Sequence, residues 1–359
     1  MHEDYITIIV NDKIYSQRTP NSKFIEFDLN GVKLRTYEEL PEDIQYLAKK
    51  MVFMNENPEL HFTYEHTDDG VVITSFFPSV GSHVKIPDFV DGRPVVELSS
   101  KLINYSNFEE IVQIQLPDTI KKFGFECFKE AKNLQYINIP PQVKTIPDGC
   151  FANTGIISLD LSNIESVGNN AFYNCKNLNN VNLINATDIG EYAFSMCTNL
   201  TNIKLSSLLK ELRDGVFRYA AIKEIKLPEG LQQLGDGTFE GCDKLSNINI
   251  PESLVSIAGY CFHKCENITE FIAPENLKFI GACAFANTGV KKVKLNAKLE
   301  EVSALAFNKC SNLIEVILHH PTAFLMKPFD FCDISKIKVV TPEGKYTSVK
   351  APESHEQER

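Results

Sequence analysis

Ten cysteines are the residues of this 359-residue chain whose type and spacing most readily suggest chemistry. Cysteines bind zinc or act as nucleophiles when two stand close together or when a neighbouring charge lowers the pKa of the thiol. No C-x-x-C pair occurs, and five of the cysteines instead stand three residues after a phenylalanine that recurs at a regular interval. These are Cys175, Cys197, Cys242, Cys265 and Cys310.

Further cysteines stand at or near the position before a phenylalanine, namely Cys127, Cys150, Cys261 and Cys283. Elsewhere the same two positions hold small residues such as Ala131, Ala171 and Thr154. Cysteine that exchanges with alanine and threonine is a small buried packing residue, and buried cysteines are usually inert. The pattern therefore predicts free thiols with a structural role, which suit a reducing compartment.

Other groups suited to chemistry are sparse. His319 and His320 are adjacent, but no third ligand follows at a metal-binding spacing. The sequence has no G-x-S-x-G, H-E-x-x-H or P-loop motif, and its carboxylates form no recognisable acid–base pair. We therefore expect a protein without enzymatic activity, metal or cofactor.

Charge and hydrophobicity limit the partners. The formal charge of −11 disfavours a nucleic-acid partner, which needs a basic surface. No run of about 18 apolar residues predicts insertion into a membrane. The N-terminal stretch "MHEDYITIIVNDKIY" lacks the features of a signal peptide. These observations predict a cytoplasmic protein, with the alternative of a cell-surface protein exported without a signal peptide.

The phenylalanines that accompany the cysteines recur every 21–23 residues, which indicates a repeat. They are Phe128, Phe151, Phe172, Phe194, Phe217, Phe239, Phe262, Phe285 and Phe307. A second pattern, apolar-x-x-apolar-x-apolar, keeps step with them in ten consecutive copies, from Ile111/Ile114/Leu116 to Leu313/Val316/Leu318. Its final x-apolar-x-apolar part has the period of two that is typical of a strand with one buried face.

One coil of this repeat offers about five apolar side chains and cannot bury them alone, so the coils must stack. Stacked coils place their strands side by side in the same direction. The sequence therefore predicts an α/β-type repeat solenoid, right-handed, with about ten coils of 21–23 residues and a parallel β-sheet on its concave side.

The repeat unit resembles the BspA-like, or Treponema-type, leucine-rich repeat L-x-x-I-x-I-P-x-x-V-x-x-I-G-x-x-A-F-x-x-C. The stretch "LSNINIPESLVSIAGYCFHKC", from Leu245 to Cys265, matches it almost letter for letter. The resemblance covers about Gly70 to Val349, including an irregular opening coil and a closing segment that ends in "TPEGKY". It implies a leucine-rich repeat solenoid, and it suggests a surface adhesin, since BspA-like proteins are often found at bacterial and protist surfaces and bind extracellular matrix proteins.

Residues 1–65 differ in pattern. The stretches "YITIIVNDKIY" and "FIEFDLNGVKLRTY" each predict a β-hairpin, the second with Asn30-Gly31 as its turn. The stretch "PEDIQYLAKKMVFM" predicts an amphipathic helix. We expect a small ββα-type module that either caps the solenoid, which would span residues 66–350, or docks a partner. The polar residues 351–359 predict a disordered tail.

The side chains between the buried strand positions must point outward, because side chains alternate along a strand. They form two columns along the predicted sheet. The first column is Gln113, Tyr136, Ser158, Asn180, Asn202, Glu224, Asn247, Glu270, Lys292 and Glu315. The second column is Gln115, Asn138, Asp160, Asn182, Lys204, Lys226, Asn249, Ile272, Lys294 and Ile317.

These columns are the candidate partner-binding surface. They are either a merely solvated polar face or a groove for a protein, peptide or glycan, with an apolar anchor at Ile272 and Ile317. The leading hypothesis is a non-enzymatic interaction scaffold that binds a macromolecule through this face. The alternatives are a surface adhesin of the BspA-like type and, more remotely, a catalytic or docking activity in residues 1–65.

Overall fold

The computed structural model describes residues 6–10, 13–17, 24–28, 31–35, 62–76, 83–102, 111–318, 328–329, 331–333, 337–340 and 346–348. The contacts of the chain divide it into two compact units, residues 1–63 and 64–359. The unit of residues 64–359 contains the repeats.

The first unit contains a four-stranded antiparallel sheet in chain order. Its strands are β1 (Ile6–Val10), β2 (Lys13–Gln17), β3 (Phe24–Asp28) and β4 (Gly31–Arg35). The pairs β1–β2 and β3–β4 are the two expected hairpins, and β2 also pairs with β3. The expected turn at Asn30-Gly31 is shifted, because Gly31 already pairs with Asp28 as part of β4. The helix expected within residues 41–54 lies outside the described residues.

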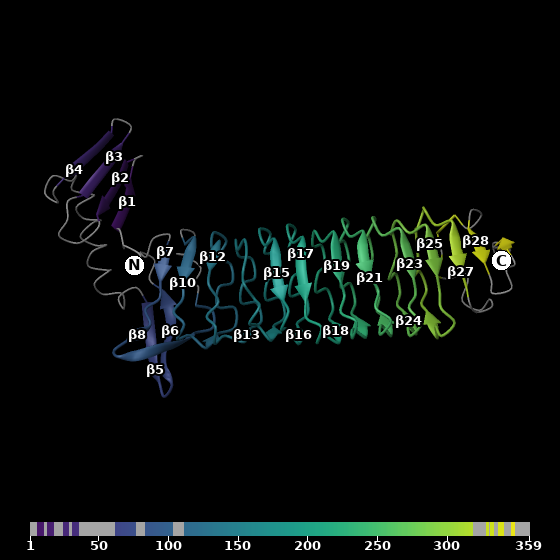
Figure 1. Cartoon of the computed structure of the whole chain (residues 1–359), viewed down its shortest axis with the longest axis horizontal. Helices are drawn as coiled ribbons and strands as arrows, with labels where there is room; N and C mark the ends of the chain where they lie inside the picture. Colours follow the sequence, from purple (N-terminus) through teal and green to yellow (C-terminus); the bar gives the residue numbers. More distant parts are fainter. Residues whose placement is uncertain are drawn as a thin grey trace, which may run out of the picture. The chain divides into compact units, whose positions relative to one another are not determined.

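The second unit is a β-solenoid of consecutive coils, most of which add a strand to the wall that was predicted from the repeat (Figure 1). In the described residues, hydrogen bonds join these strands into four groups and not into one continuous sheet. We call this wall the first sheet. Its strands are β7 (His83–Lys85), β10 (Gln113–Gln115), β12 (Tyr136–Ile137), β15 (Asn180–Leu183), β17 (Asn202–Leu205), β19 (Glu224–Lys226), β21 (Asn247–Asn249), β23 (Glu270–Ile272), β25 (Lys292–Lys294), β27 (Glu315–Ile317), β28 (Lys338–Val340) and β29 (Tyr346–Ser348).

Neighbouring strands of the first sheet are parallel and in register with the repeat, as in the pairs Asn180↔Asn202 and Lys292↔Glu315. The third copy of the strand pattern contributes only a single bridge, between Ser158 and Asn180. At the far end β29 pairs with β28 in the antiparallel direction, which ends the parallel series.

A second wall of mostly parallel strands forms where each chain segment returns; hydrogen bonds join its described strands into three groups, and we call this wall the second sheet. It contains β5 (Phe62–Thr67), β6 (Gly70–Phe76), β9 (Arg93–Leu98), β11 (Lys122–Phe123), β13 (Thr145–Ile146), β14 (Ser166–Val167), β16 (Asp188–Ile189), β18 (Glu211–Leu212), β20 (Gln233–Leu234), β22 (Ser256–Ile257), β24 (Phe279–Ile280) and β26 (Glu301–Val302), while β8 (Phe89–Val90) pairs antiparallel with β9. The part of this unit that the structure describes has no helix, so the second wall of the solenoid is also β-structure.

The repeat phenylalanines form one continuous stack through the core. All nine are fully buried, and neighbouring ring centroids from Phe128 to Phe329 lie 5.0–5.9 Å apart with planes within 24° of parallel. Parallel strands repeat at about 4.8 Å, so ring stacking and hydrogen bonding require nearly the same spacing between coils.

The backbone around each repeat phenylalanine forms hydrogen bonds within its own turn, as from the N–H of Cys175 to the carbonyl of Phe172 at 3.2 Å, and also to the next coil. The N–H of Phe172, for example, donates to the carbonyl of Ala193 at 2.8 Å. The residues two before and two after each repeat phenylalanine have positive φ, as at Asn170 (54°) and Asn174 (58°), a conformation that asparagine tolerates. An N–H group that bonds to the next coil is not available for a helical hydrogen bond, and residues with positive φ do not fit a right-handed helix. This explains why the chain forms turns around each repeat phenylalanine.

Candidate binding surface

The register of the first sheet assembles the two predicted columns. Glu270, Lys292 and Glu315 are direct neighbours in the first column, and so are Ile272, Lys294 and Ile317 in the second. The predicted contact residues that are exposed are Tyr136, Asn138, Asp160, Asn180, Asn202, Lys204, Glu224, Lys226, Asn247, Glu270 and Ile272. Those that are half-buried are Asn182, Asn249, Lys292, Lys294, Glu315 and Ile317.

Two asparagines of the second column hold the coils together. Asn249 Oδ1 accepts the N–H of Leu227 at 2.7 Å, and its Nδ2 donates to the carbonyl of Leu227 at 3.1 Å. Asn138 makes the same pair of bonds to Leu116, at 2.7 and 2.8 Å. Each therefore satisfies a backbone donor and acceptor of the preceding coil with its side-chain amide, which leaves little hydrogen-bonding capacity for a partner.

Other polar residues of the middle coils differ in their hydrogen bonding. Asn202 Nδ2 donates to Asn180 Oδ1 at 2.8 Å along the first column. Asp160 accepts the backbone N–H of Ser162 at 3.0 Å, and hydrogen bonds from Ser162 lower the pKa of the Asp160 carboxyl. Asn182 Oδ1 is buried and has no hydrogen-bond partner in the described part of the chain.

Toward the C-terminal end the two columns differ in charge. In the first column, Lys292 Nζ lies 4.0 Å from Glu270 Oε1 and 3.9 Å from Glu315 Oε2, so it bridges two carboxylates. In the second column, Ile272 is 51% exposed. Ile317 is only half-buried rather than fully exposed, so the apolar surface centres on Ile272.

The cysteines form a hydrogen-bonded ladder beside the phenylalanine stack. Where a cysteine stands three residues after a repeat phenylalanine, its thiol donates to the carbonyl of the preceding repeat phenylalanine, as from Cys175 to Phe151 (3.0 Å) and from Cys242 to Phe217 (3.1 Å). All ten cysteines are free, and eight are buried. Burial raises the pKa of the Cys175 thiol to about 11 and that of Cys242 to about 12. The predicted packing role therefore includes a weak hydrogen bond that the sequence did not reveal.

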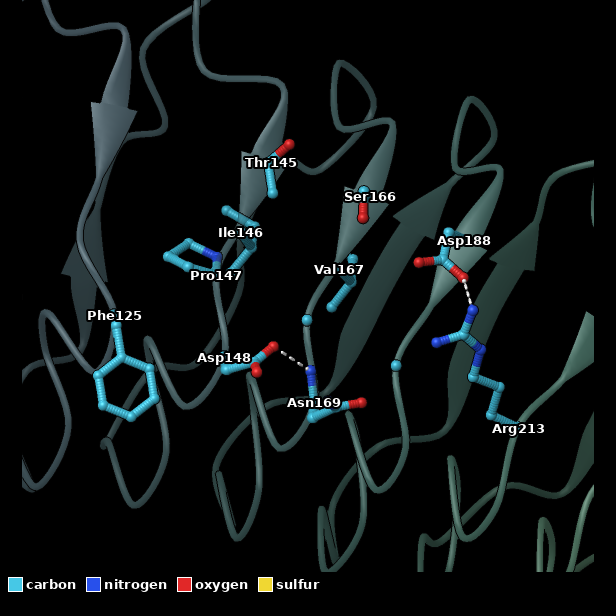
Figure 2. A pocket seen from close by; sticks show the side chains of 12 residues that line it. Phe125, Thr145, Ile146, Pro147, Asp148, Ser166, Val167, Asn169, Asp188 and Arg213 are labelled. Carbon is cyan, nitrogen blue, oxygen red and sulfur yellow. Dashed lines mark hydrogen bonds and ion pairs between the residues drawn. The ribbon is translucent and has the colours of Figure 1, made fainter.

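A shallow groove with a volume of about 380 Å³ lies on the second sheet over β13, β14 and β16 (Figure 2). Figure 2 shows Phe125 at one end of it and the ion pair of Arg213 with Asp188, at 2.9 Å, at the other. Between them Asp148 Oδ1 accepts the backbone N–H of Asn169 at 2.7 Å. These polar groups bind residues of neighbouring coils, so the groove belongs to the contacts that stack the coils.

A polar cluster that the sequence pattern did not indicate lies on the phenylalanine turns. Glu240 accepts from Tyr219 and His263, both at 3.4 Å, and His263 contacts Asn287 at 3.1 Å. Arg218 Nε is 2.9 Å from Glu240, at ion-pairing distance although off the hydrogen-bond direction. The members lie on successive coils and satisfy one another, which indicates a structural role.

No group of three or more His, Cys, Asp or Glu side chains in the described part of the chain is placed to hold a metal ion. His319 and His320 lie outside the described residues. Among the described segments, none forms a helix with the length and apolar character needed to cross a membrane.

One further coil was not predicted from the sequence. Phe329 stacks on Phe307 at 5.1 Å, and the Cys332 thiol donates to the Phe307 carbonyl at 3.1 Å. On the first sheet this coil continues the columns with Lys338 and Val340. The signal was available, since Phe329 follows Phe307 by 22 residues within an otherwise irregular segment.

Two solved structures share this architecture. A leucine-rich repeat protein from Bacteroides ovatus is 24% identical, with a TM-score of 0.66 over 79% of this chain and 78% of its own. A leucine rich cell surface protein from Faecalibacterium prausnitzii is 17% identical, with a TM-score of 0.52 over 72% of this chain and 87% of its own. At these identities the likeness shows the fold alone. None of the curated proteins matches the chain.

Stacked coils with one outward strand each, a buried phenylalanine column and two in-register surface columns define a leucine-rich repeat solenoid. The family model of the BspA type leucine rich repeat region matches six copies within residues 101–221, 187–314 and 232–342, which together span more than half of the chain. The protein therefore belongs to the BspA-type leucine-rich repeat family.

The cysteine ladder predicts a sharp division in thiol reactivity. At about pH 8, a thiol with the pKa of Cys175 is ionised in roughly one molecule in a thousand, and burial also excludes the reagent. We expect iodoacetamide to alkylate the partly exposed Cys283 and Cys332 at least tenfold faster than Cys175 or Cys242, as followed by mass spectrometry of the native protein. In denaturant all ten cysteines should be alkylated at similar rates. Equal native rates would contradict the ladder.

The asparagine bonds predict different costs for two residues of β21. Replacing Asn249 by alanine leaves the N–H and carbonyl of Leu227 without partners, so Asn249→Ala should lower the free energy of unfolding by about 1–3 kcal/mol. The matched variant Asn247→Ala removes an exposed first-column side chain and should cost less than about 0.5 kcal/mol. Urea unfolding measures both. Equal losses would show that the amide bonds do not stabilise the coils.

Proposed function

We propose that this protein is a non-enzymatic interaction scaffold that binds a macromolecular partner, most simply a protein or peptide, through the outward face of the first sheet. The observation that carries the proposal is the in-register pair of columns with the half-exposed Ile272 among them. An apolar side chain in the middle of a polar sheet offers the buried area that interface anchors need.

The second sheet supports this choice by contrast. The polar groups in its groove over β13, β14 and β16 bind one another across neighbouring coils, as Arg213 does with Asp188. The first sheet instead carries polar side chains without partners in the described part of the chain, such as Glu224 and Lys226. Solenoids commonly bind partners on such extended strand surfaces.

A surface adhesin is the second candidate function. It is supported by the likeness to a leucine rich cell surface protein, although that likeness extends only to the fold. The ten free cysteines favour a reducing compartment and therefore a cytoplasmic scaffold.

Fractionation of native cells separates the two candidates. If the scaffold proposal is right, antibodies against the chain should detect it in the cytosolic fraction, and protease added to intact cells should leave it whole. Detection mainly in the surface fraction, with loss on protease treatment, would establish the adhesin instead.

Substitution of Ile272 tests the binding face. Ile272→Asp places a charge at the proposed anchor and should weaken binding of a partner purified from the native host at least tenfold, by surface plasmon resonance. The matched control is Phe279→Asp on β24 of the second sheet, since Phe279 is also a large exposed apolar residue, at 39%.

A photo-crosslinking amino acid at each position gives an independent readout. Position 272 should capture the partner and position 279 should not, and circular dichroism should show that every variant remains folded. Capture from position 279 alone would move the binding site to the second sheet.

A further inference from the structure

The second column is cationic and apolar over its C-terminal half. From Asn182 to Val340 it contains no carboxylate, and three of its residues are lysines, namely Lys204, Lys226 and Lys294. None of the three lysine side chains makes a hydrogen bond or an ion pair in the described part of the chain. Lys292, which lies in the neighbouring first column, is in contrast held between Glu270 and Glu315.

Ile272 interrupts this run of unpaired charges. It pairs in register with Lys294, which in turn pairs with Ile317. The second column therefore reads lysine, lysine, asparagine, isoleucine, lysine, isoleucine from Lys204 to Ile317. A complementary ligand must offer carboxylates to the lysines and one apolar group to Ile272.

Acidic residues border the column on both sides. Glu224, Glu270 and Glu315 belong to the first column. On the other side of the second column, Glu229, Glu252 and Glu275 each stand three residues after the last residue of a strand. All but Glu315 are exposed. The cationic strip is thus one side chain wide, so a broad anionic surface such as a membrane or a duplex would meet carboxylates on either side.

We propose that the ligand of the first sheet is an extended acidic peptide segment, with an apolar side chain between two carboxylates, that runs along the second column. This inference rests on the proposed function and names the chemistry of the partner. The charges set the register of the segment, and burial against Ile272 supplies the contact area.

The spacing of the column suits such a segment. Lys226 and Lys294 lie on β19 and β25, three coils apart, which corresponds to about 14 Å at the usual strand separation. In an extended peptide, residues four apart on one face are separated by about 13 Å. The pattern acid-x-apolar-x-acid therefore places its carboxylates near the two lysines and its apolar residue between them.

Synthetic peptides test the proposal with the full chain. The probe is a fluorescent peptide with the core Glu-Thr-Leu-Thr-Glu, compared by anisotropy with Lys-Thr-Leu-Thr-Lys and with Gln-Thr-Leu-Thr-Gln. We expect the acidic peptide to bind at least tenfold more tightly than either, and to weaken as salt is raised. Equal binding of the three peptides, or tighter binding of single-stranded DNA or a sulfated oligosaccharide than of the acidic peptide, would overturn the proposal.

Charge reversal provides the matched variants. The double variant Lys226→Glu with Lys294→Glu should lose the acidic peptide at least tenfold and gain the basic one. Lys121→Glu reverses an exposed lysine that directly precedes β11 of the second sheet, and should change neither affinity. An unchanged preference in the double variant contradicts the inference.

The native partner distinguishes this inference from the proposed function. If Ile272→Asp abolishes binding of that partner while the double lysine variant binds it normally, the first sheet is the binding face but the acidic ligand is wrong. If neither change affects the native partner, the proposed function itself fails.

Discussion

The structure depends on one constraint, the stacking of each coil on the next at hydrogen-bonding distance. A coil satisfies only part of its backbone by itself, since the N–H of Phe172 bonds to Ala193 of the next coil and the thiol of Cys197 bonds back to Phe172. The ring of Phe172 lies 5.1 Å from that of Phe194, close to the separation of paired strands. Ring stacking, strand pairing and the thiol ladder therefore share a single spacing, and each reinforces the others.

Because of this spacing, residues 21–23 positions apart in the sequence are neighbours in the structure. Residues of the same type can therefore have different roles in different positions of a coil. Asn249 and Asn138 bind the backbone of the preceding coil, whereas Asn247 of the same strand as Asn249 remains exposed. The same sorting applies to lysine, since Lys292 has two carboxylates in reach and Lys294, two residues later, has none in the described part of the chain. The residues available to a partner are those that the stacking does not use.

Family membership accounts for the repeated residues but not for the partner. The positions that recur in every coil, such as Phe217 and Cys242, are buried and would be the same for any ligand. The proposals on function rest instead on residues that vary between coils, chiefly Ile272 and Lys294 in a column where three coils have asparagine. A solenoid can change such residues at little cost to stability, because outward side chains contribute little to the core.

The sequence by itself determined the repeat interval, the buried face of each strand and the packing role of the cysteines. These follow from periodicity and residue size, which are properties of the chain alone. Only the tertiary structure decided that the returning segments form a second sheet and that residues such as Tyr192 adopt positive φ. It also decided which of Asn249 and Asn247 bonds to the neighbouring coil. Such features depend on distances between coils, and the order of residues along one coil does not contain them.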